Sequence, residues 1–312
     1  MKSQIDMVSN STLVIGVLAR DCVFRLKNNI PLVEKLGSMF RDYYVVVYEN
    51  DSVDGTKECI QQWAKENTHV IAISEQLHQV TIPPKSKQNV KPTKSLWRIQ
   101  KMAGFRNRIL EEVHQRFSPD YFCFIDIDIA SFIPSSVVEA IEKAPVDWGA
   151  LCASGHLYYS KSDGSVLPAN FQYDAYAFFP EGSSPEKMGK STVSHKWHLI
   201  SAWSAEKLVR SHEYASCRSA FNGLAIYKWD VMKNLRYSAV QNEELKEEGF
   251  ALCEHLSLHS GIISLGYKVY ITRIMEVVYL HKKYTFWRFF NNWYNILLAE
   301  LYLFYFRLRK IV

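Results

Sequence analysis

Residues 121–128 read Tyr121-Phe122-Cys123-Phe124-Ile125-Asp126-Ile127-Asp128, an apolar run that ends in two aspartates separated by one residue. A short apolar run of this kind is typical of a strand that is buried on both faces of a parallel sheet. In open α/β sheets, ligands bind beyond the carboxyl ends of the strands. In an extended segment, residues i and i+2 point the same way, so we expect Asp126 and Asp128 to face one site.

The charge of this pair suggests its chemistry. Two carboxylates that face one site repel each other, and a divalent cation with a phosphate ligand behind it would relieve the repulsion. Two other interpretations stay open: the acids could cap the next turn, or Asp126 could be the nucleophile of a haloacid-dehalogenase-type phosphatase. That phosphatase motif normally lies near the start of a chain, whereas apolar strands precede it here. We therefore expect an enzyme, with the phosphatase as an alternative.

The composition is that of a globular protein with room for one large or two ordinary domains. The chain has 312 residues, of which 48% are hydrophobic and 22% are charged. Its six cysteines lie far apart and form no CxxC pair, so we expect buried, reduced thiols. The first residues contain no apolar signal segment. These features predict a cytoplasmic protein, and peripheral binding to the inner face of a membrane stays open.

The net charge of +5 is concentrated at the end of the chain. Residues 281–312 contain six Lys or Arg and one acid, which accounts for the whole excess, so residues 1–280 are neutral overall. A nucleic-acid-binding protein would more often have a basic body, and we expect no nucleic acid among the partners. We interpret residues 1–280 as one domain and residues 281–312 as a basic, aromatic tail.

Apolar runs and helical spacing predict alternating strands and helices that pair as βαβ units. The expected strands are 12–18, 43–48, 70–73, 121–125, 146–152, 224–227 and 267–272. The expected helices are 54–67, 96–113, one that opens with a capping box at 136–139, and 254–265, which ends at Gly266. Residues 155–215 show little pattern and could hold acceptor-binding loops.

A polar turn follows the strand at 43–48, and it contains Glu49, Asn50 and Asp51 before the sequence S-V-D-G-T. Short polar side chains at the carboxyl end of a strand can hydrogen-bond a nucleobase or a ribose. The same residue types are also ordinary in turns and helix caps, so the turn could be purely structural. In the helix at 96–113, Arg106 offers a planar fork suited to phosphate or carboxylate, unless it lies on a solvated helix face.

The order of these features resembles the layout of the GT-A glycosyltransferases, in particular the family 2-type nucleotide-sugar enzymes. The shared parts are a strand ending in an acidic or amide pair, the S-x-D-G-T sequence, a helix with Arg106-Asn107, and a strand ending in D-x-D. Residues 171–177 (FQYDAYA) and 219–225 (SAFNGLA) are also similar to segments of the capsule-associated and fungal-type mannosyltransferases. The similarity covers roughly residues 12–281.

This resemblance implies an α/β fold of the GT-A (Rossmann-like) type, with a mixed, mostly parallel sheet flanked by helices and a C-terminal amphipathic helical tail. It implies a metal-dependent glycosyltransferase that moves a sugar, such as mannose, from a nucleotide-sugar donor to a glycan or lipid-linked acceptor. The implied cofactor is Mn²⁺ or Mg²⁺. A non-catalytic module that binds sugar nucleotides or membranes would share the scaffold and is kept as a further alternative.

Residues that bind the donor follow from the same resemblance. Glu49, Asn50 and Asp51 would hold the base or ribose, although family 2 enzymes commonly have aspartate where Asn50 stands. Arg106 would approach the nucleotide. Further substrate contacts would come from the two segments that are similar to mannosyltransferases, at Asp174 and Asn222.

The resemblance also implies the catalytic and metal-binding residues. Asp126 would contact the ribose or a metal-bound water, and Asp128 would bind the cation that bridges the diphosphate. Glu254 would be the general base in an inverting enzyme, whereas in a retaining enzyme it would orient the substrate. His281 would complete the metal shell, unless it is simply an exposed histidine of the tail.

The tail is rich in aromatic residues. Residues 284–306 contain eleven aromatics, with basic clusters at both ends. The apolar run 296–306 is too short to cross a bilayer and includes Glu300. Aromatic residues with flanking Lys and Arg suit an interfacial helix on an anionic membrane. The alternative is a helix packed on the body of the protein or on a second subunit.

Overall fold

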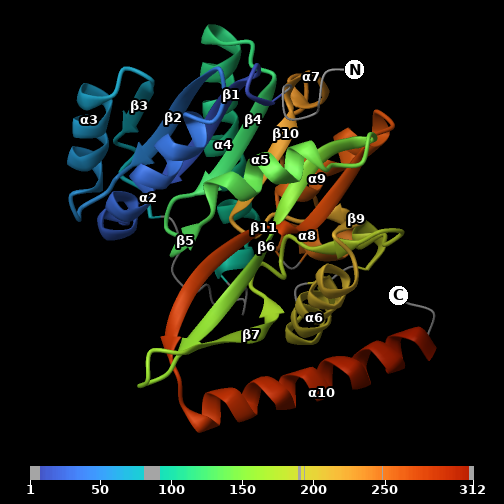
Figure 1. Ribbon diagram of the computed structural model, residues 1–312. Helices are drawn as coiled ribbons and strands as arrows, with labels where there is room; N and C mark the ends of the chain where they lie inside the picture. Colours follow the sequence, from blue (N-terminus) through green and yellow to red (C-terminus); the bar gives the residue numbers. More distant parts are fainter. Residues whose placement is uncertain (1–7, 81–91, 189–190, 193, 248, 309–312) are drawn as a thin grey trace.

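The computed structural model describes residues 8–80, 92–188, 191–192, 194–247 and 249–308. Within them the chain forms one eleven-stranded sheet with helices on both faces (Figure 1). The strand order is β3-β2-β1-β4-β10-β6-β11-β9-β8, with β5 paired to β11 and β7 paired to β6.

The strands are β1 (Thr12–Ala19), β2 (Asp42–Asn50), β3 (Val70–Glu75), β4 (Tyr121–Asp126), β5 (Ser131–Phe132), β6 (Trp148–Ser160), β7 (Val166–Gln172), β8 (Phe179–Pro180), β9 (Tyr214–Ser219), β10 (Leu224–Lys228) and β11 (Lys268–Lys283). The helices are α2 (Val23–Gly37), α3 (Thr56–Glu66), α4 (Leu96–Arg116), α5 (Pro134–Glu142), α6 (His195–Ser211), α7 (Trp229–Met232), α8 (Glu243–Glu247), α9 (His255–Ser264) and α10 (Phe286–Leu308).

The mixed sheet with a mostly parallel core confirms the predicted fold class. Strands β3, β2, β1 and β4 pair in parallel, as do β6 and β11, while β10 lies antiparallel between β4 and β6. The register places Leu18 of β1 opposite both Tyr48 of β2 and Asp126 of β4. The carboxyl ends of three neighbouring strands therefore end at one level, where the sequence places its polar residues.

Alternation along β1 divides the core into two layers. Leu13, Ile15 and Val17 pack in one cluster with residues of α2, α3 and α5, whereas Val14 packs on the other face with residues of α4 and α9. Gly16 also faces α4, and a Cβ there would lie 2.8 Å from the rings of Phe122 and Phe124. Glycine at this position lets the two rings and α4 pack close to β1.

Residues 155–215 contain more regular structure than their weak pattern indicated, and their role in acceptor binding stays a prediction. β6 continues to Ser160 and pairs with β7, and α6 and β9 follow. Helix α6 begins at a cap in which the Ser194 side chain accepts a hydrogen bond from the Trp197 N–H. Polar Ser201 and Glu206 occupy buried positions of α6. They interrupt the apolar period by which the sequence would have indicated a helix.

Glu206 belongs to a buried ionic cluster between α6 and the long strands. The His156 ring lies 3.0 Å from Glu206 through Nε2 and 3.5 Å from Glu276 through Nδ1. Burial lowers the pKa of His156, but its hydrogen bonds to the two glutamates outweigh burial and raise the pKa to about 9. The cluster therefore holds a charged imidazolium that ties α6 to β6 and β11.

The replacement His156→Gln should lower the free energy of unfolding by about 2 kcal/mol below pH 6.5, because it removes hydrogen bonds from a charged group. Since the folded-state pKa of His156 is raised, this loss should shrink as the pH rises through about 9, where the wild-type histidine is neutral. Urea unfolding across this range measures the difference. His212→Gln, at an exposed histidine, is the control. A loss that stays constant across the range would contradict the account.

The predicted helix starts are partly wrong. Helix α5 begins at Pro134 without a side-chain cap, and the Ser136 hydroxyl donates to the Ile133 carbonyl at 2.7 Å instead of capping the helix. Proline at the first position fixes the backbone for a helix, which explains the earlier start. Helix α3 has Gly55 at its N-cap position, and the Asp54 carboxylate just before it accepts a hydrogen bond from the Thr56 N–H at 3.0 Å.

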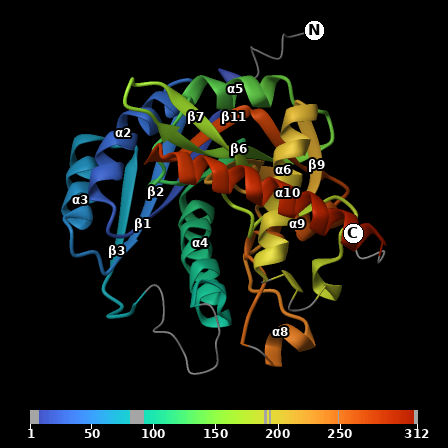
Figure 2. The ribbon, with the colours of Figure 1, turned by 90° about the horizontal axis from the view of Figure 1, so that it is seen from below.

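The end of the chain is helical, as predicted. β11 is longer than expected and runs past residue 280 to Lys283 before α10 begins. α10 packs against α6 and β7 and crosses one side of the molecule (Figures 1 and 2). Among the described residues, no helix has the length and apolar character that a membrane span requires. The basic residues Arg309 and Lys310 lie outside the described residues.

Candidate active site

A pocket of about 280 Å³ opens where β1, β2 and β4 end. Its walls also include residues of α4 and of the segment that leads into α9. The arginine, carboxylate and amide side chains that line it are Arg20, Asn50, Arg98, Arg106, Asp126, Asp128, Asp174 and Glu254. The fold thus brings together six of the predicted site residues, which come from distant parts of the sequence.

Asp126 and Asp128 line this pocket together, but not as two residues of one strand. β4 ends at Asp126, and Asp128 lies exposed in the following turn. Fully buried Asn29 of α2 holds the turn, because its Nδ2 donates to the carbonyls of Ile127 and Ile129 at 2.9 and 2.8 Å. Helix α2 therefore fixes the backbone on both sides of Asp128.

Arg106 is a buried cation between two of the site's acids. Its side chain lies 3.2 Å from Glu254 and 3.5 Å from Asp126, and only 3% of the residue is exposed. The guanidinium carbon also lies 4.8 Å from the ring centroid of Phe221 and 5.1 Å from that of Phe124. The geometry makes Arg106 the counter-charge for the carboxylates, whereas the sequence resemblance implied an approach to the nucleotide.

The acids of the pocket share a crowded negative environment. Desolvation raises the pKa of Asp126 to about 7, Arg106 opposes this shift, and the nearby carboxylates add to it. Desolvation raises the pKa of Asp174 to about 6, and Glu254 adds to that shift. The pocket therefore holds more carboxylates than its own cations neutralise, which favours binding of an additional positive charge.

A tight turn between β9 and β10 places Asp126 and Asp174. Asn222 and Gly223 both have positive φ, at 56° and 84°, which suits asparagine and glycine. The Asp126 N–H donates to the Gly223 carbonyl at 2.8 Å, and the Asn222 Oδ1 accepts from the Asp174 N–H at 3.3 Å. Asn222 is buried, so it orders the pocket from behind. Its predicted contact with substrate stays a prediction.

Glu254 lies at the start of α9, at the position expected from the sequence. It is 5% exposed and lines the pocket, and its Oε1 is bound to the Nε of Arg106. The Cys253 thiol lies 3.5 Å from Oε2. Both carboxylate oxygens therefore have a partner in the protein: the Arg106 guanidinium at Oε1 and the Cys253 thiol, a weak donor, at Oε2.

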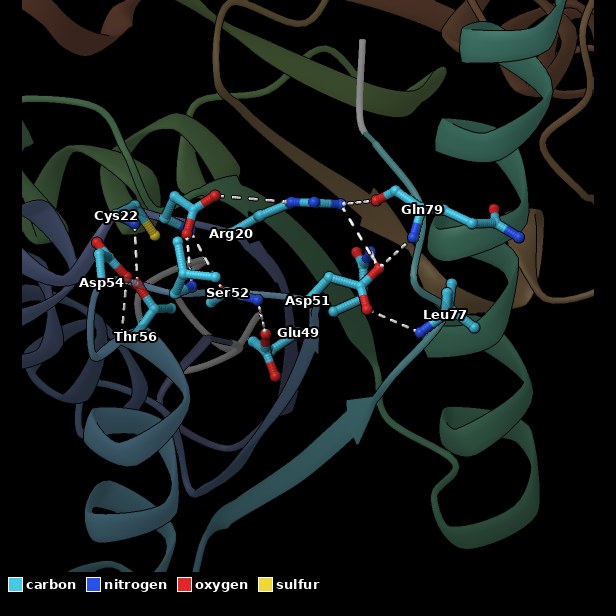
Figure 3. A network of polar contacts seen from close by, with 12 residues as sticks. Arg20, Cys22, Glu49, Asp51, Ser52, Asp54, Thr56, Leu77 and Gln79 are labelled. Carbon is cyan, nitrogen blue, oxygen red and sulfur yellow. Dashed lines mark hydrogen bonds and ion pairs between the residues drawn. The ribbon is translucent and has the colours of Figure 1, made fainter. Parts of the chain in front are cut away.

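The turn after β2 is held by its own acids (Figure 3). The buried Glu49 accepts from the Ser52 N–H at 2.8 Å and from the Ser74 hydroxyl at 2.6 Å. Asp51, at a φ of 54°, accepts from the backbone N–H groups of Leu77 and His78 at 2.8 and 2.9 Å. Glu49 and Asp51 therefore shape the rim, and between them Asn50 lines the pocket.

Two cations of the pocket were missed in the sequence. Arg20 follows β1 directly, donates to the Gln79 carbonyl at 2.9 Å and lies 3.8 Å from Asp51 (Figure 3). Arg98, in the first turn of α4, also lines the pocket. The position of Arg20 at the end of an apolar strand was the signal that could have revealed it, because β1 ends level with β4.

Of the two predicted metal ligands, Asp128 and His281, the structure places one in the pocket. Asp128 lines the pocket, whereas His281 lies exposed on β11 with its ring 5.9 Å from that of Tyr158. Within the described ranges, no three His, Cys, Asp or Glu side chains are grouped as ligands of one metal ion. The metal role of His281 stays a prediction.

One protein family matches most of this chain. The sequence model described as Cryptococcal mannosyltransferase 1 matches residues 25–259. The chain belongs to the Cryptococcal mannosyltransferase 1 family. The matched range includes both aspartates, Arg106, Asp174 and Glu254, and it ends before β11 and α10. A search of curated protein sequences gives no significant match.

Solved structures with the same general arrangement are distant in sequence. They include the mannosyltransferase PcManGT from Pyrobaculum calidifontis in complex with GDP-Man and Mn²⁺, at 12% identity and a TM-score of 0.45, covering 86% of this chain and 56% of that one. GalNAc-T7 with UDP, GalNAc and Mn²⁺ gives 10% identity, a TM-score of 0.44, and coverage of 88% and 44%. TarS from S. aureus gives 13% identity and a TM-score of 0.40, covering 86% of this chain and 60% of that one. The chain spans about half the length of these proteins, and the assignment rests on the family match.

Membership of the Cryptococcal mannosyltransferase 1 family confirms the resemblance to the capsule-associated mannosyltransferases. It is inconsistent with the alternative in which Asp126 is the nucleophile of a haloacid-dehalogenase-type phosphatase. The pocket of this family member contains acids that come from β4, from the segment after β7 and from the start of α9.

Proposed function

We propose that this protein is a metal-dependent glycosyltransferase that transfers mannose from a nucleoside diphosphate to a hydroxyl group of a glycan or lipid-linked acceptor. The observation that supports this most is the gathering of Asp126, Asp128, Asp174 and Glu254 around Arg106 in one pocket. Membership of a mannosyltransferase family supports mannose as the sugar.

The nucleobase would lie against the wall formed by Leu18, Tyr48 and Phe105. The rings of Tyr48 and Phe105 stack on each other with centroids 5.1 Å apart, so this wall is firmly held. Flat apolar surfaces of this kind accept any base. The Asn50 amide also lines the pocket, and although its Nδ2 donates to Asp51 Oδ2 at 3.1 Å, its remaining N–H and its Oδ1 would contribute to the choice of base.

The diphosphate would lie beside Asp126 and Asp128. Mg²⁺-like cations are often held by one or two protein carboxylates together with substrate phosphates and water, so a closed cage of protein ligands is not needed. The exposed carboxylate of Asp128, with Asp126 behind it, fits this mode. A bound Mn²⁺ or Mg²⁺ would neutralise negative charge on the leaving diphosphate. Arg20 and Arg98 would add positive charge along the rim.

The acceptor hydroxyl would approach from the side of Glu254. Arg106 fixes the Glu254 carboxylate through Oε1, and Oε2, whose partner in the protein is the weak thiol donor of Cys253, would accept a hydrogen bond or a proton from the hydroxyl. Asp174, which lines the same pocket and has its backbone held by Asn222, would orient the sugar hydroxyls.

A donor that occupies the pocket should raise the melting temperature of the protein. At a hundred times its dissociation constant, a ligand adds about 2.7 kcal/mol to the free energy of unfolding, which corresponds to roughly 5 °C. We expect this shift with GDP-mannose in the presence of Mn²⁺, and a smaller one when EDTA replaces the metal. UDP-glucose, UDP-N-acetylglucosamine and mannose 1-phosphate complete the panel.

The outcome separates the alternatives. A shift with any nucleotide sugar, together with release of the nucleoside diphosphate, supports the transferase. A shift without release across a panel of glycan and lipid-linked acceptors would indicate a module that only binds sugar nucleotides. The absence of any shift across the panel would contradict the proposed donor site.

A further inference from the structure

Helix α10 presents a long apolar face to solvent. Residues spaced alternately three and four apart along the helix lie on this face, and each is between 52% and 76% exposed. They are Trp287, Phe290, Tyr294, Leu297, Leu301 and Phe304. This row, called here the outer face of α10, extends over five helical turns, far more than the scattered exposed apolar residues of an ordinary surface.

The opposite side of α10 is fixed to the body of the protein. Ala299 and Leu303 are buried, and Leu303 packs in a cluster with residues of α6 and β8. Glu300, the sole acid in the sequence of α10, binds the Lys207 ammonium at 2.8 Å and the Trp203 indole N–H at 2.5 Å. The acid of this helix is therefore engaged by α6.

Basic side chains lie at the start of the outer face. Lys282 and Lys283 are exposed at the end of β11, and exposed Arg288 lies in the first turn of α10, where its guanidinium donates to the Lys283 carbonyl at 2.8 Å. The side of α10 that faces away from the body thus combines aromatic and aliphatic side chains with positive charge. That combination complements a surface that is apolar inside and anionic outside.

We propose that the outer face of α10 lies in the headgroup region of an anionic membrane. Tryptophan and tyrosine favour this region because their rings are apolar with one polar group, and lysine and arginine attract the lipid phosphates. A second copy of the chain is a poorer occupant. Helix pairs prefer aliphatic residues at the three-and-four spaced positions and charged residues beside them, whereas exposed Phe286 and Trp293 flank the row here.

The arrangement of the sheet fits this orientation. The Ala130 N–H, two residues after Asp128, donates to the Val278 carbonyl of β11, and β11 continues from there to Lys283 and α10. Figure 1 shows β5 and the end of β11 on the side of the sheet where α10 lies. A membrane along α10 would thus lie on the side of the sheet where β1, β2 and β4 end and where the pocket opens.

Flotation with lipid vesicles tests the proposal without any sugar substrate. The full chain should float with phosphatidylcholine vesicles that contain phosphatidylglycerol, and more weakly with phosphatidylcholine alone. The triple variant Trp287→Ser, Phe290→Ser and Leu297→Ser should bind at least tenfold more weakly, because each of these side chains would lose burial in lipid. Lys282→Gln with Lys283→Gln should weaken binding to the anionic vesicles about fivefold per charge.

A matched control removes exposed apolar residues elsewhere: Ile133→Ser, Val146→Ser and Leu265→Ser should float like the wild type. All variants alter exposed positions, and their melting curves confirm that they are folded. Flotation of the Trp287 triple variant at the wild-type level would overturn the proposal, as would a wild type that stays with the unbound fraction. Sedimentation of the wild type as a dimer that the triple variant dissociates, without vesicle binding, would identify a second copy as the partner.

Discussion

Sugar transfer should fall about a thousandfold when Asp128 is replaced by alanine, and the part of donor binding that depends on Mn²⁺ should disappear. Stabilisation of charge by a bound cation is worth several kcal/mol, and about 4 kcal/mol corresponds to three orders of magnitude in rate. Asp128 is the acid best placed to hold that cation, because it is exposed in the pocket while Arg106 engages Asp126 and Glu254.

The fold of this variant should be intact. The turn around Asp128 is held through the carbonyls of Ile127 and Ile129 by Asn29, and not through the aspartate side chain. Asp230→Ala, at an aspartate that is 89% exposed on the short helix α7, is the matched control and should keep wild-type activity. Transfer by Asp128→Ala at the wild-type rate would remove the metal role from this residue.

The second large effect is expected on stability. Replacing Arg106 by methionine leaves Asp126 and Glu254 without their buried counter-charge, and such an uncompensated partner typically costs about 3–5 kcal/mol. The melting temperature should fall by roughly 5–10 °C. Calorimetry or urea unfolding measures the change. Arg108→Met on the same helix is the control, because Arg108 is 37% exposed and the buried Glu112 keeps Arg116 as a second partner, so the loss should be about 0–1 kcal/mol.

The dependence on pH distinguishes a counter-charge from simple packing. Asp126 already has a raised pKa of about 7, and loss of Arg106 would raise it further. A carboxylate with a raised folded-state pKa destabilises the protein once it ionises. The free energy of unfolding lost in Arg106→Met should therefore be larger well above pH 7 than well below it. An equal loss at both ends would mean that Arg106 acts only by filling space. Arg106→Lys should recover part of the stability, because it keeps the charge without the planar fork.

The sequence predicted the central strands of the sheet, because an apolar run alone is enough to indicate a buried strand. β1, β2 and β4 are uninterrupted apolar runs, as strands buried on both faces must be. The polar residues at their ends were therefore correctly expected to meet. α6 and the hairpin of β6 and β7 were missed because their inward positions include Glu206, His156 and Gln172, which satisfy one another only after folding.

Six of the predicted site residues line one pocket, but the sequence did not predict the contacts among them. Nothing in the sequence pairs Arg106 with Glu254, which lies 148 residues later, because the pair forms only when α4 and α9 pack on the same face of the sheet. Asn29 is likewise an unremarkable polar residue until α2 brings it to the turn at Asp128. For the tail, the sequence left lipid and protein contacts open, and the structure shows that one side of α10 packs on α6.

The proposed activity requires that the Asp128 pocket binds a mannose donor through a divalent cation. Release of GDP from GDP-mannose, measured with the wild-type protein and an acceptor panel, tests it directly. We expect release of GDP in the presence of Mn²⁺, loss of release with EDTA, recovery when Mn²⁺ is restored, and no metal-dependent release by Asp128→Ala. Release that is unchanged by EDTA and by Asp128→Ala would contradict it.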